Sequence, residues 1–113
     1  MPIENWSDNV LLVELADDPQ FTDDMTALLE AVGARENLDV VLNFQHVTFL
    51  NSSNIAKLLK LRKIVAVTRG RKLRLCAIST HVWGVFLVTG LDKIFDVYDD
   101  VASGLASLHL DGG

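Results

Sequence analysis

The 113-residue sequence lacks the features that commonly stabilise secreted proteins or anchor proteins in membranes. Cysteine occurs only once, at Cys76, so no disulfide can form within the chain, and this usage is typical of a reducing compartment. The chain does not open with a basic stretch and an apolar run, and its longest apolar stretches are far shorter than a membrane span. We therefore expect a cytoplasmic protein without membrane insertion.

The motifs of common enzyme chemistries are also missing. The sequence has no glycine-rich phosphate loop, no dinucleotide-binding fingerprint and no Gly-x-Ser-x-Gly elbow. Its histidines, His46, His81 and His109, stand apart from one another and from any cluster of metal-ligating residues. Cys76 lies within an apolar run, which is typical of an inert core thiol. We therefore expect a protein that is not an enzyme and holds no metal or cofactor.

Acidic residues are absent from positions 51 to 91, although the whole chain carries a net charge of −5. Eight of the ten basic residues fall in that stretch: Lys57, Lys60, Arg62, Lys63, Arg69, Arg71, Lys72 and Arg74. No aromatic residues alternate with them, and the lysines fall on the polar side of one predicted helix. We interpret this side as a solvated surface or a protein-docking surface, and we expect no nucleic-acid partner.

The apolar and polar residues follow a pattern of alternating strands and helices. The expected strands are residues 3–6, 10–15, 39–44, 73–78 and 94–98. The expected helices begin at Thr22 or Asp23, within 51–54, at 79–80 and at 99–100, and the first three end at Gly33, Gly70 and Gly90. Helices between strands require crossover connections, so the fold class is α/β, with a small mixed, largely parallel sheet of about four to five strands and about four helices. Length and composition predict one domain over residues 1–113.

The helix that follows the Asn51–Asn54 cluster carries the most informative pattern. Ile55, Leu58, Leu59 and Val65 form an apolar stripe, which we expect to face the core. Ser52 or Ser53 is expected to cap the helix, because hydroxyls accept hydrogen bonds from the free N–H groups of its first turn. Elsewhere, Trp6 and Trp83 are both expected to be packed.

Five segments in this order resemble the sulfate transporter and anti-sigma factor antagonist (STAS) family. They are Val41-Leu42-Asn43-Phe44, Val47-Thr48-Phe49-Leu50, Asn51-Ser52-Ser53-Asn54, Gly70-Arg71-Lys72-Leu73-Arg74-Leu75-Cys76 and Val88-Thr89-Gly90-Leu91-Asp92-Lys93-Ile94-Phe95. In the family the corresponding segments are a buried strand, a loop ending in a hydrophobic pair, Asp-Ser-Ser/Thr-Gly at a helix start, Gly-x-x-Leu-x-Leu and Thr/Ser-Gly-Leu-x-x-x-Phe. The resemblance extends from about residue 8 to residue 108.

The resemblance implies a protein-binding switch of the anti-sigma factor antagonist type. Its partners would be an anti-sigma factor that is itself a serine kinase, and a phosphatase that resets the switch. The kinase of such systems phosphorylates the first serine after the aspartate, which corresponds here to Ser52. The neighbouring residues Asn51, Ser53, Asn54 and Lys57 would then contact the partner. The motifs specify no oligomeric state.

The sequence departs from the family pattern at the predicted switch. The family's aspartate and glycine are replaced by Asn51 and Asn54, and Val13-Glu14-Leu15-Ala16-Asp17 replaces its Gly-Glu-Leu-Asp. Asn51 can still cap the helix but brings no carboxylate, and Asn54 adds a side chain at a helix end that we expect to face solvent. We expect both changes to make Ser52 a poor kinase substrate. The alternative is a phosphorylation-independent scaffold or adaptor subunit of a signalling complex or transporter.

Overall fold

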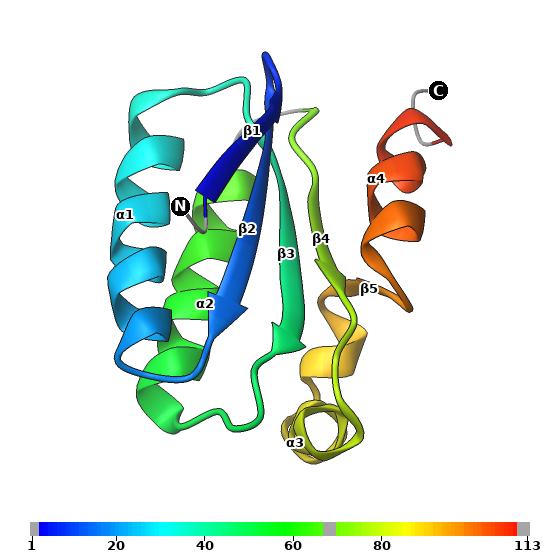
Figure 1. Cartoon of the computed structure of the whole chain (residues 1–113). Coiled ribbons are helices and arrows are strands. Elements are labelled where there is room, and N and C mark those ends of the chain that lie inside the picture. Colours follow the sequence, from blue (N-terminus) through cyan, green and yellow to red (C-terminus); the bar gives the residue numbers. More distant parts are fainter. Residues whose placement is uncertain (1–2, 67–69, 111–113) are drawn as a thin grey trace.

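The computed structural model of the protein describes residues 3–66 and 70–110 (Figure 1). Its strands are β1 (Ile3–Ser7), β2 (Val10–Ala16), β3 (Asp39–His46), β4 (Leu73–Cys76) and β5 (Asp96–Tyr98). Its helices are α1 (Gln20–Ala34), α2 (Ser52–Ala66), α3 (Thr80–Thr89), the 3₁₀ helix η1 (Leu91–Lys93) and α4 (Val101–Leu110). The strands form one sheet in the order β1-β2-β3-β4-β5, in which only β1 runs antiparallel to its neighbour. The predicted α/β class with a mixed, largely parallel sheet is confirmed.

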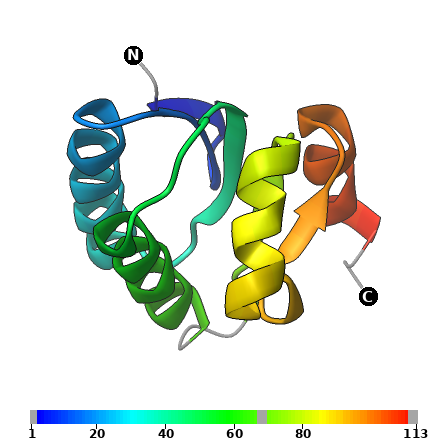
Figure 2. The ribbon, with the colours of Figure 1, turned by 90° about the horizontal axis from the view of Figure 1, so that it is seen from below.

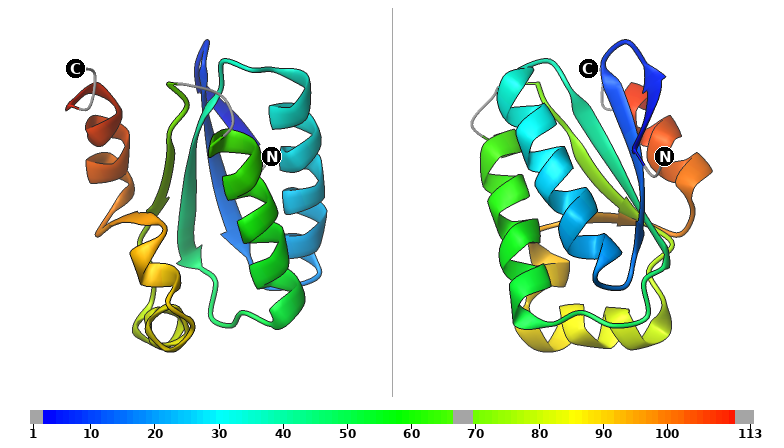
Figure 3. Two further views of the ribbon diagram at one scale, coloured as in Figure 1. Left: turned by 180° about the vertical axis from the view of Figure 1, so that it is seen from behind. Right: turned by 60° about the vertical axis from the view of Figure 1, so that its left-hand side comes forward.

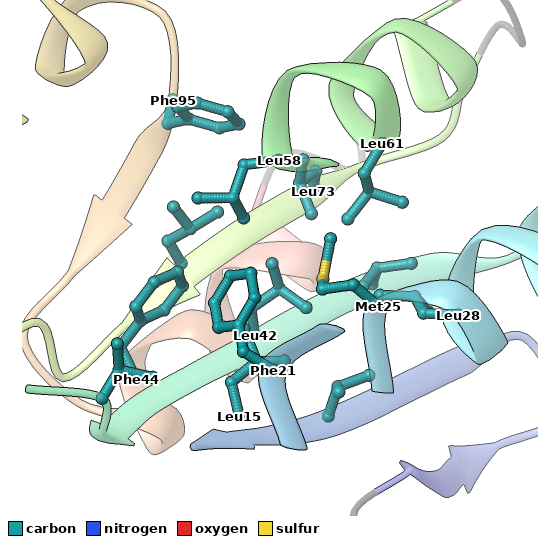
Figure 4. Packing of buried hydrophobic residues seen from close by; sticks show 14 of the residues in the cluster. Leu15, Phe21, Met25, Leu28, Leu42, Phe44, Leu58, Leu61, Leu73 and Phe95 are labelled. Atoms are coloured by element: carbon teal, nitrogen blue, oxygen red, sulfur yellow. The ribbon is translucent and has the colours of Figure 1, made fainter. Parts of the chain in front are cut away.

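The sheet separates a large core from a small one. On one face lie α1 and α2, with α3 at the carboxyl end of the strands, whereas α4 covers the other face (Figures 1 and 3). Apolar side chains of β2, β3, α1 and α2 fill the larger core, including Leu15, Phe21, Leu42 and Leu58 (Figure 4). β3 is buried from Val40 to Phe44 because both of its faces are covered, as its continuous apolar run predicts.

Two glycines mark chain reversals through their backbone angles. Gly90 follows α3 with φ at +79°, and its N–H donates to the carbonyl of Leu87, so the predicted end of this helix is confirmed. Gly70 also has a left-handed φ, of +87°, and α2 is helical to Ala66, while residues 67–69 lie outside the described part of the chain. The predicted end of α1 at Gly33 is wrong, because the helix passes through this residue to Ala34.

Other boundaries differ from the sequence prediction by a few residues. α1 begins at Gln20, earlier than Thr22 or Asp23, because the side chain of Asp18 accepts the backbone N–H of Thr22. β4 ends at Cys76, since Ala77 has a φ of +59°, which no strand can contain. β5 begins at Asp96, because η1 and the turn after it occupy the preceding residues.

Two of the expectations about burial are wrong, and one is confirmed. Trp6 on the edge strand β1 is 55% exposed rather than packed. On α2, Leu59 faces solvent and Leu61 is buried instead, because the face that meets the sheet is rotated toward Asn54, Leu58, Leu61 and Val65. Cys76 is buried, and burial raises the pKa of its thiol to about 11, so this thiol is inert as predicted.

Candidate protein-docking site

The start of α2 lies at the carboxyl end of the parallel strands. β3 ends at His46, and residues 47–51 lead directly into the helix. Viewed from this end, α2 and α3 lie on the two sides of the loop that follows β3 (Figure 2). Seen from the side, α3 and the first turn of α2 lie at the same end of the molecule (Figure 3). This end of the sheet therefore presents the predicted site together with α3.

Asn51 is the residue that caps α2. Its Oδ1 accepts the backbone N–H of Asn54 at 2.8 Å, while Oδ1 of Asn54 accepts the backbone N–H of Asn51 at 3.1 Å. Such a reciprocal pair satisfies two N–H groups at once, as in a capping box. The expectation that Ser52 or Ser53 caps the helix is therefore wrong, while Asn51 keeps the capping geometry as predicted.

The two serines of the motif form the exposed first turn of α2. Both Ser52 and Ser53 are exposed. In the part of the chain that the structure describes, neither serine N–H has a hydrogen-bond acceptor. Lys57, one turn later, donates from Nζ to the Oγ of Ser53 at 2.9 Å. An exposed hydroxyl, two free N–H groups and an ammonium group therefore occupy one helix end, and this combination is suited to an anionic group.

Asp18 connects the start of α2 to the start of α1 through hydrogen bonds. Its Oδ2 accepts hydrogen bonds from the side-chain amides of Asn54, at 3.0 Å, and Asn51, at 3.4 Å. Its Oδ1 accepts the hydroxyl and the backbone N–H of Thr22, at 2.7 and 2.9 Å. These hydrogen bonds lower the pKa of Asp18 to about 2. The bond from the Thr22 hydroxyl has the largest effect, and the bond from the Asn54 amide has the next largest. The carboxylate therefore remains charged and joins two helix N-termini.

Asn54 is buried, which corrects the expectation that it faces solvent. Its side chain is part of the inward face of α2, and the residue is 1% exposed. The amide is fully engaged with Asn51 and Asp18, so it satisfies the polar groups that burial would otherwise leave unpaired. Asn54 therefore offers almost no surface to a partner and acts on the site through the groups that it holds.

A second aspartate of the same segment holds the loop before α2. Asp17 accepts the backbone N–H of Thr48 at 2.8 Å and the hydroxyl of Thr48 at 2.5 Å. The hydroxyl bond is the main reason that the pKa of Asp17 lies below its ordinary value. Residues 17 and 18 together therefore fix both sides of the loop between β3 and α2.

Phe49 is the site residue that sequence reasoning did not single out. Its ring is 56% exposed, whereas its neighbour Leu50 is buried. The signal in the sequence was the hydrophobic pair Phe49-Leu50, of which only Leu50 is buried in the fold. An exposed aromatic ring three residues before Ser52 is a feature typical of protein interfaces.

The other candidate groups do not join this site. Nε2 of His46 lies 3.3 Å from Oε1 of Glu14 on the neighbouring strand, and both side chains are exposed. Over residues 3–66 and 70–110, no three His, Cys, Asp or Glu side chains are placed to hold a metal ion. The same residues include no helix with the length and apolar character needed to cross a membrane. The site thus consists of the start of α2 and the loop before it.

The fold is that of a STAS domain. The STAS domain family model matches residues 16–104, and the chain belongs to this family. The anti-sigma F factor antagonist of Paenibacillus polymyxa is 27% identical over 104 residues, covering 89% of this chain and 88% of the relative.

Two solved structures have the same fold at low sequence identity. SpoIIAA of Bacillus, an anti-sigma factor antagonist in its unphosphorylated form, matches with a TM-score of 0.78 and 18% identity, covering 98% of this chain and 96% of the other. A chain of the stressosome, a signal integration and transduction hub, matches with a TM-score of 0.76 and 17% identity, covering 98% of both chains. These likenesses confirm the fold.

Proposed function

We propose that this protein is a binding module that docks an anti-sigma factor with serine kinase activity, and that phosphorylation of Ser52 releases it. The observation that carries the proposal is the exposed Ser52 hydroxyl in the first turn of α2, beside free backbone N–H groups. The similarity to the Paenibacillus polymyxa antagonist, and to SpoIIAA, which occurs in unphosphorylated and phosphorylated forms, supports this assignment.

The docking surface consists of Phe49, Asn51, Ser52, Ser53 and Lys57. Phe49 supplies exposed apolar area, and the serines supply small polar contacts next to it. Aromatic side chains that a partner can bury contribute much of the affinity of protein complexes. Asn54 supports this surface from below, because its amide fixes the position of Asn51.

A phosphate on Ser52 would alter this surface without unfolding the domain. The free N–H groups of Ser52 and Ser53 and the helix dipole favour an anion at this position, and Lys57 lies within one turn. The same dianion would have to lose its water when a partner covers it, and the desolvation of a charge in an interface is costly. Phosphorylation would thus weaken docking while the fold persists.

A scaffold or adaptor role is the second candidate, and the departures at Asn51 and Asn54 favour it. Two neutral amides occupy the positions at which the family motif has a carboxylate and a glycine. The similarity to a stressosome chain supports a role in which binding alone carries the signal. In both cases we propose a cytoplasmic, non-catalytic protein, with a phosphatase as a further partner only if Ser52 is modified.

Binding and phosphorylation measured on the same samples distinguish these roles. Wild type, Ser52→Ala and the matched control Ser53→Ala are each incubated with the purified kinase-type anti-sigma factor. Calorimetry measures binding, and intact-mass spectrometry after addition of ATP measures phosphorylation. The switch predicts binding by all three proteins and phosphate on wild type and Ser53→Ala only. Binding without a mass increase would support the scaffold role, and no binding by any of the three would refute both.

A further inference from the structure

A cleft of about 450 Å³ opens at the carboxyl ends of β4 and β5, beside the start of α3. Ligand sites of small proteins commonly have volumes of about 300–1,000 Å³. In open α/β sheets they lie outside the carboxyl ends of the strands. The residues that line the cleft are Ile78, Thr80, Trp83, Val97, Tyr98 and Asp99. None of them belongs to the docking surface, so this site is separate from Ser52.

Part of the cleft wall is apolar and aromatic. Trp83 stacks on Phe86 with ring centroids 6.1 Å apart, so its indole is held in one orientation by the core. Ile78 and Val97 also pack against the larger core and leave part of their surface to the cleft. Such preformed walls suit the body of an aromatic or aliphatic ligand, because no side chain has to be ordered when it binds.

The charge at the rim is negative. Asp99 is exposed, and in the described part of the chain it has no hydrogen-bond or ion-pair partner. Asp100 adds a second carboxylate, which caps α4 by accepting the N–H of Ser103 at 2.7 Å. Among the described residues, no basic side chain lines the cleft. Arg74 lies over the ring of Tyr98, but its guanidinium is paired with Asp96 at 3.1 Å and is not part of the lining.

From this combination we infer that the cleft binds a small organic cation, with an apolar body between Trp83 and Ile78 and its positive charge at Asp99. The aromatic and aliphatic walls accept the apolar body, and the Asp99 carboxylate, which has no other partner in the described part of the chain, attracts the positive charge through a directed ion pair. Anionic ligands are disfavoured, because Asp99 and Asp100 would repel them. This inference does not depend on the proposed switch, since neither Ser52 nor its neighbours take part.

The test uses a fluorescent reporter in the cleft and three isosteric probes. Trp6→Phe leaves Trp83 as the only tryptophan, because the chain has two. The probes are 3-phenylpropylamine, 3-phenylpropanol and 3-phenylpropionate, which share an aromatic body and differ in charge. We expect saturable changes in Trp83 fluorescence with the amine, at a Kd about three- to tenfold lower than that of the alcohol, and no saturation with the carboxylate.

A variant at the rim separates charge recognition from apolar adsorption. Asp99→Asn should abolish the preference for the amine over the alcohol and leave the affinity for the alcohol unchanged. Asp8→Asn, an exposed aspartate on the hairpin between β1 and β2, serves as the matched control and should keep the preference. No saturable response to the amine, equal binding of all three probes, or a preference that survives in Asp99→Asn would overturn the inference.

Discussion

The buried amide of Asn54 donates from Nδ2 to Oδ2 of Asp18 at 3.0 Å, across 36 residues of sequence. Asn54 stands where the STAS motif has glycine, and the structure shows what the additional side chain does. It fills space on the inward face of α2, pairs with Asn51 and reaches the carboxylate that also holds the start of α1. The two departures from the family motif are therefore one connected arrangement with Asp18 at its centre.

Removing this amide should destabilise the domain. Asn54→Gly deletes the bonds to Asn51 and Asp18 and leaves the half-buried backbone N–H of Asn51 without its acceptor, which we expect to cost about 1–3 kcal/mol in the free energy of unfolding. Ala56→Gly, at an exposed position of the same helix, serves as the control for helix propensity alone, at about 1 kcal/mol. Urea unfolding of both variants measures the difference, and equal losses would show that the amide contributes nothing.

The pKa of Asp18 should depend on Thr22. In wild type it lies at about 2, below the ordinary 3.8, chiefly because the Thr22 hydroxyl donates to the carboxylate. A lowered carboxyl pKa stabilises the fold above pH 3.8, and this stabilisation is lost as the pH falls toward 2. Thr22→Val should raise the pKa, as measured by NMR titration of the carboxyl carbon.

Thr26→Val is the matched control for this titration. The hydroxyl of Thr26 donates to the carbonyl of Thr22 and makes no bond to Asp18, so the pKa of Asp18 should stay at about 2. A wild-type titration near 3.8 would contradict the hydrogen-bonded arrangement itself. So would a Thr22→Val variant whose Asp18 titrates as in wild type.

The sequence predicts the elements of this fold better than the contacts between them. Alternating apolar runs and capping residues are local signals, so the strands and the helices follow from them, whereas they point to Ser52 or Ser53 as the cap of α2 in place of Asn51. The burial of Asn54 depends on Asp18, which a different part of the chain brings to it. The exposure of Trp6 depends on the position of β1 at the edge of the sheet, which its own residues do not specify.

A negative charge at position 52 should break the complex with the anti-sigma factor. Ser52→Asp is expected to weaken binding by about 2–4 kcal/mol, because the carboxylate would lose its water in an interface that fits a neutral hydroxyl. Ser103→Asp puts the same charge in the first turn of α4, on the other face of the sheet, and should leave affinity unchanged. Calorimetry with the purified partner measures the affinity of each variant. Equal affinity of Ser52→Asp and wild type would show that Ser52 does not lie in the interface.

Phe49 should contribute more to docking than any other exposed aromatic ring. Phe49→Ala is expected to weaken binding by at least 1.4 kcal/mol, or about tenfold, since a ring buried by a partner is a typical hot spot. Trp6→Ala is the matched control, because Trp6 is exposed to the same degree, 55% against 56%, but lies on the edge strand β1. Similar losses in both variants, or none in Phe49→Ala, would show that the docking surface lies elsewhere.

The contact between α4 and the sheet requires glycine at position 104. A Cβ at Gly104 would clash with Sγ of Cys76, whose side chain is buried. Gly104→Ala should therefore destabilise the domain by about 1–3 kcal/mol, as overpacking does. Gly33→Ala, where no atom lies within 4 Å of the new Cβ, should instead stabilise α1 by up to about 1 kcal/mol.

The clash between a Cβ at position 104 and the Cys76 side chain can be tested by removing Sγ of Cys76. Cys76→Ala deletes Sγ and leaves a small cavity, so alone it should cost about 1–2 kcal/mol. In the double variant Gly104→Ala/Cys76→Ala the new methyl group occupies that cavity, and the loss should be smaller than the sum of the two single losses by at least 1 kcal/mol. Additive losses would place the strain elsewhere along α4, because two residues that clash directly should show non-additive losses.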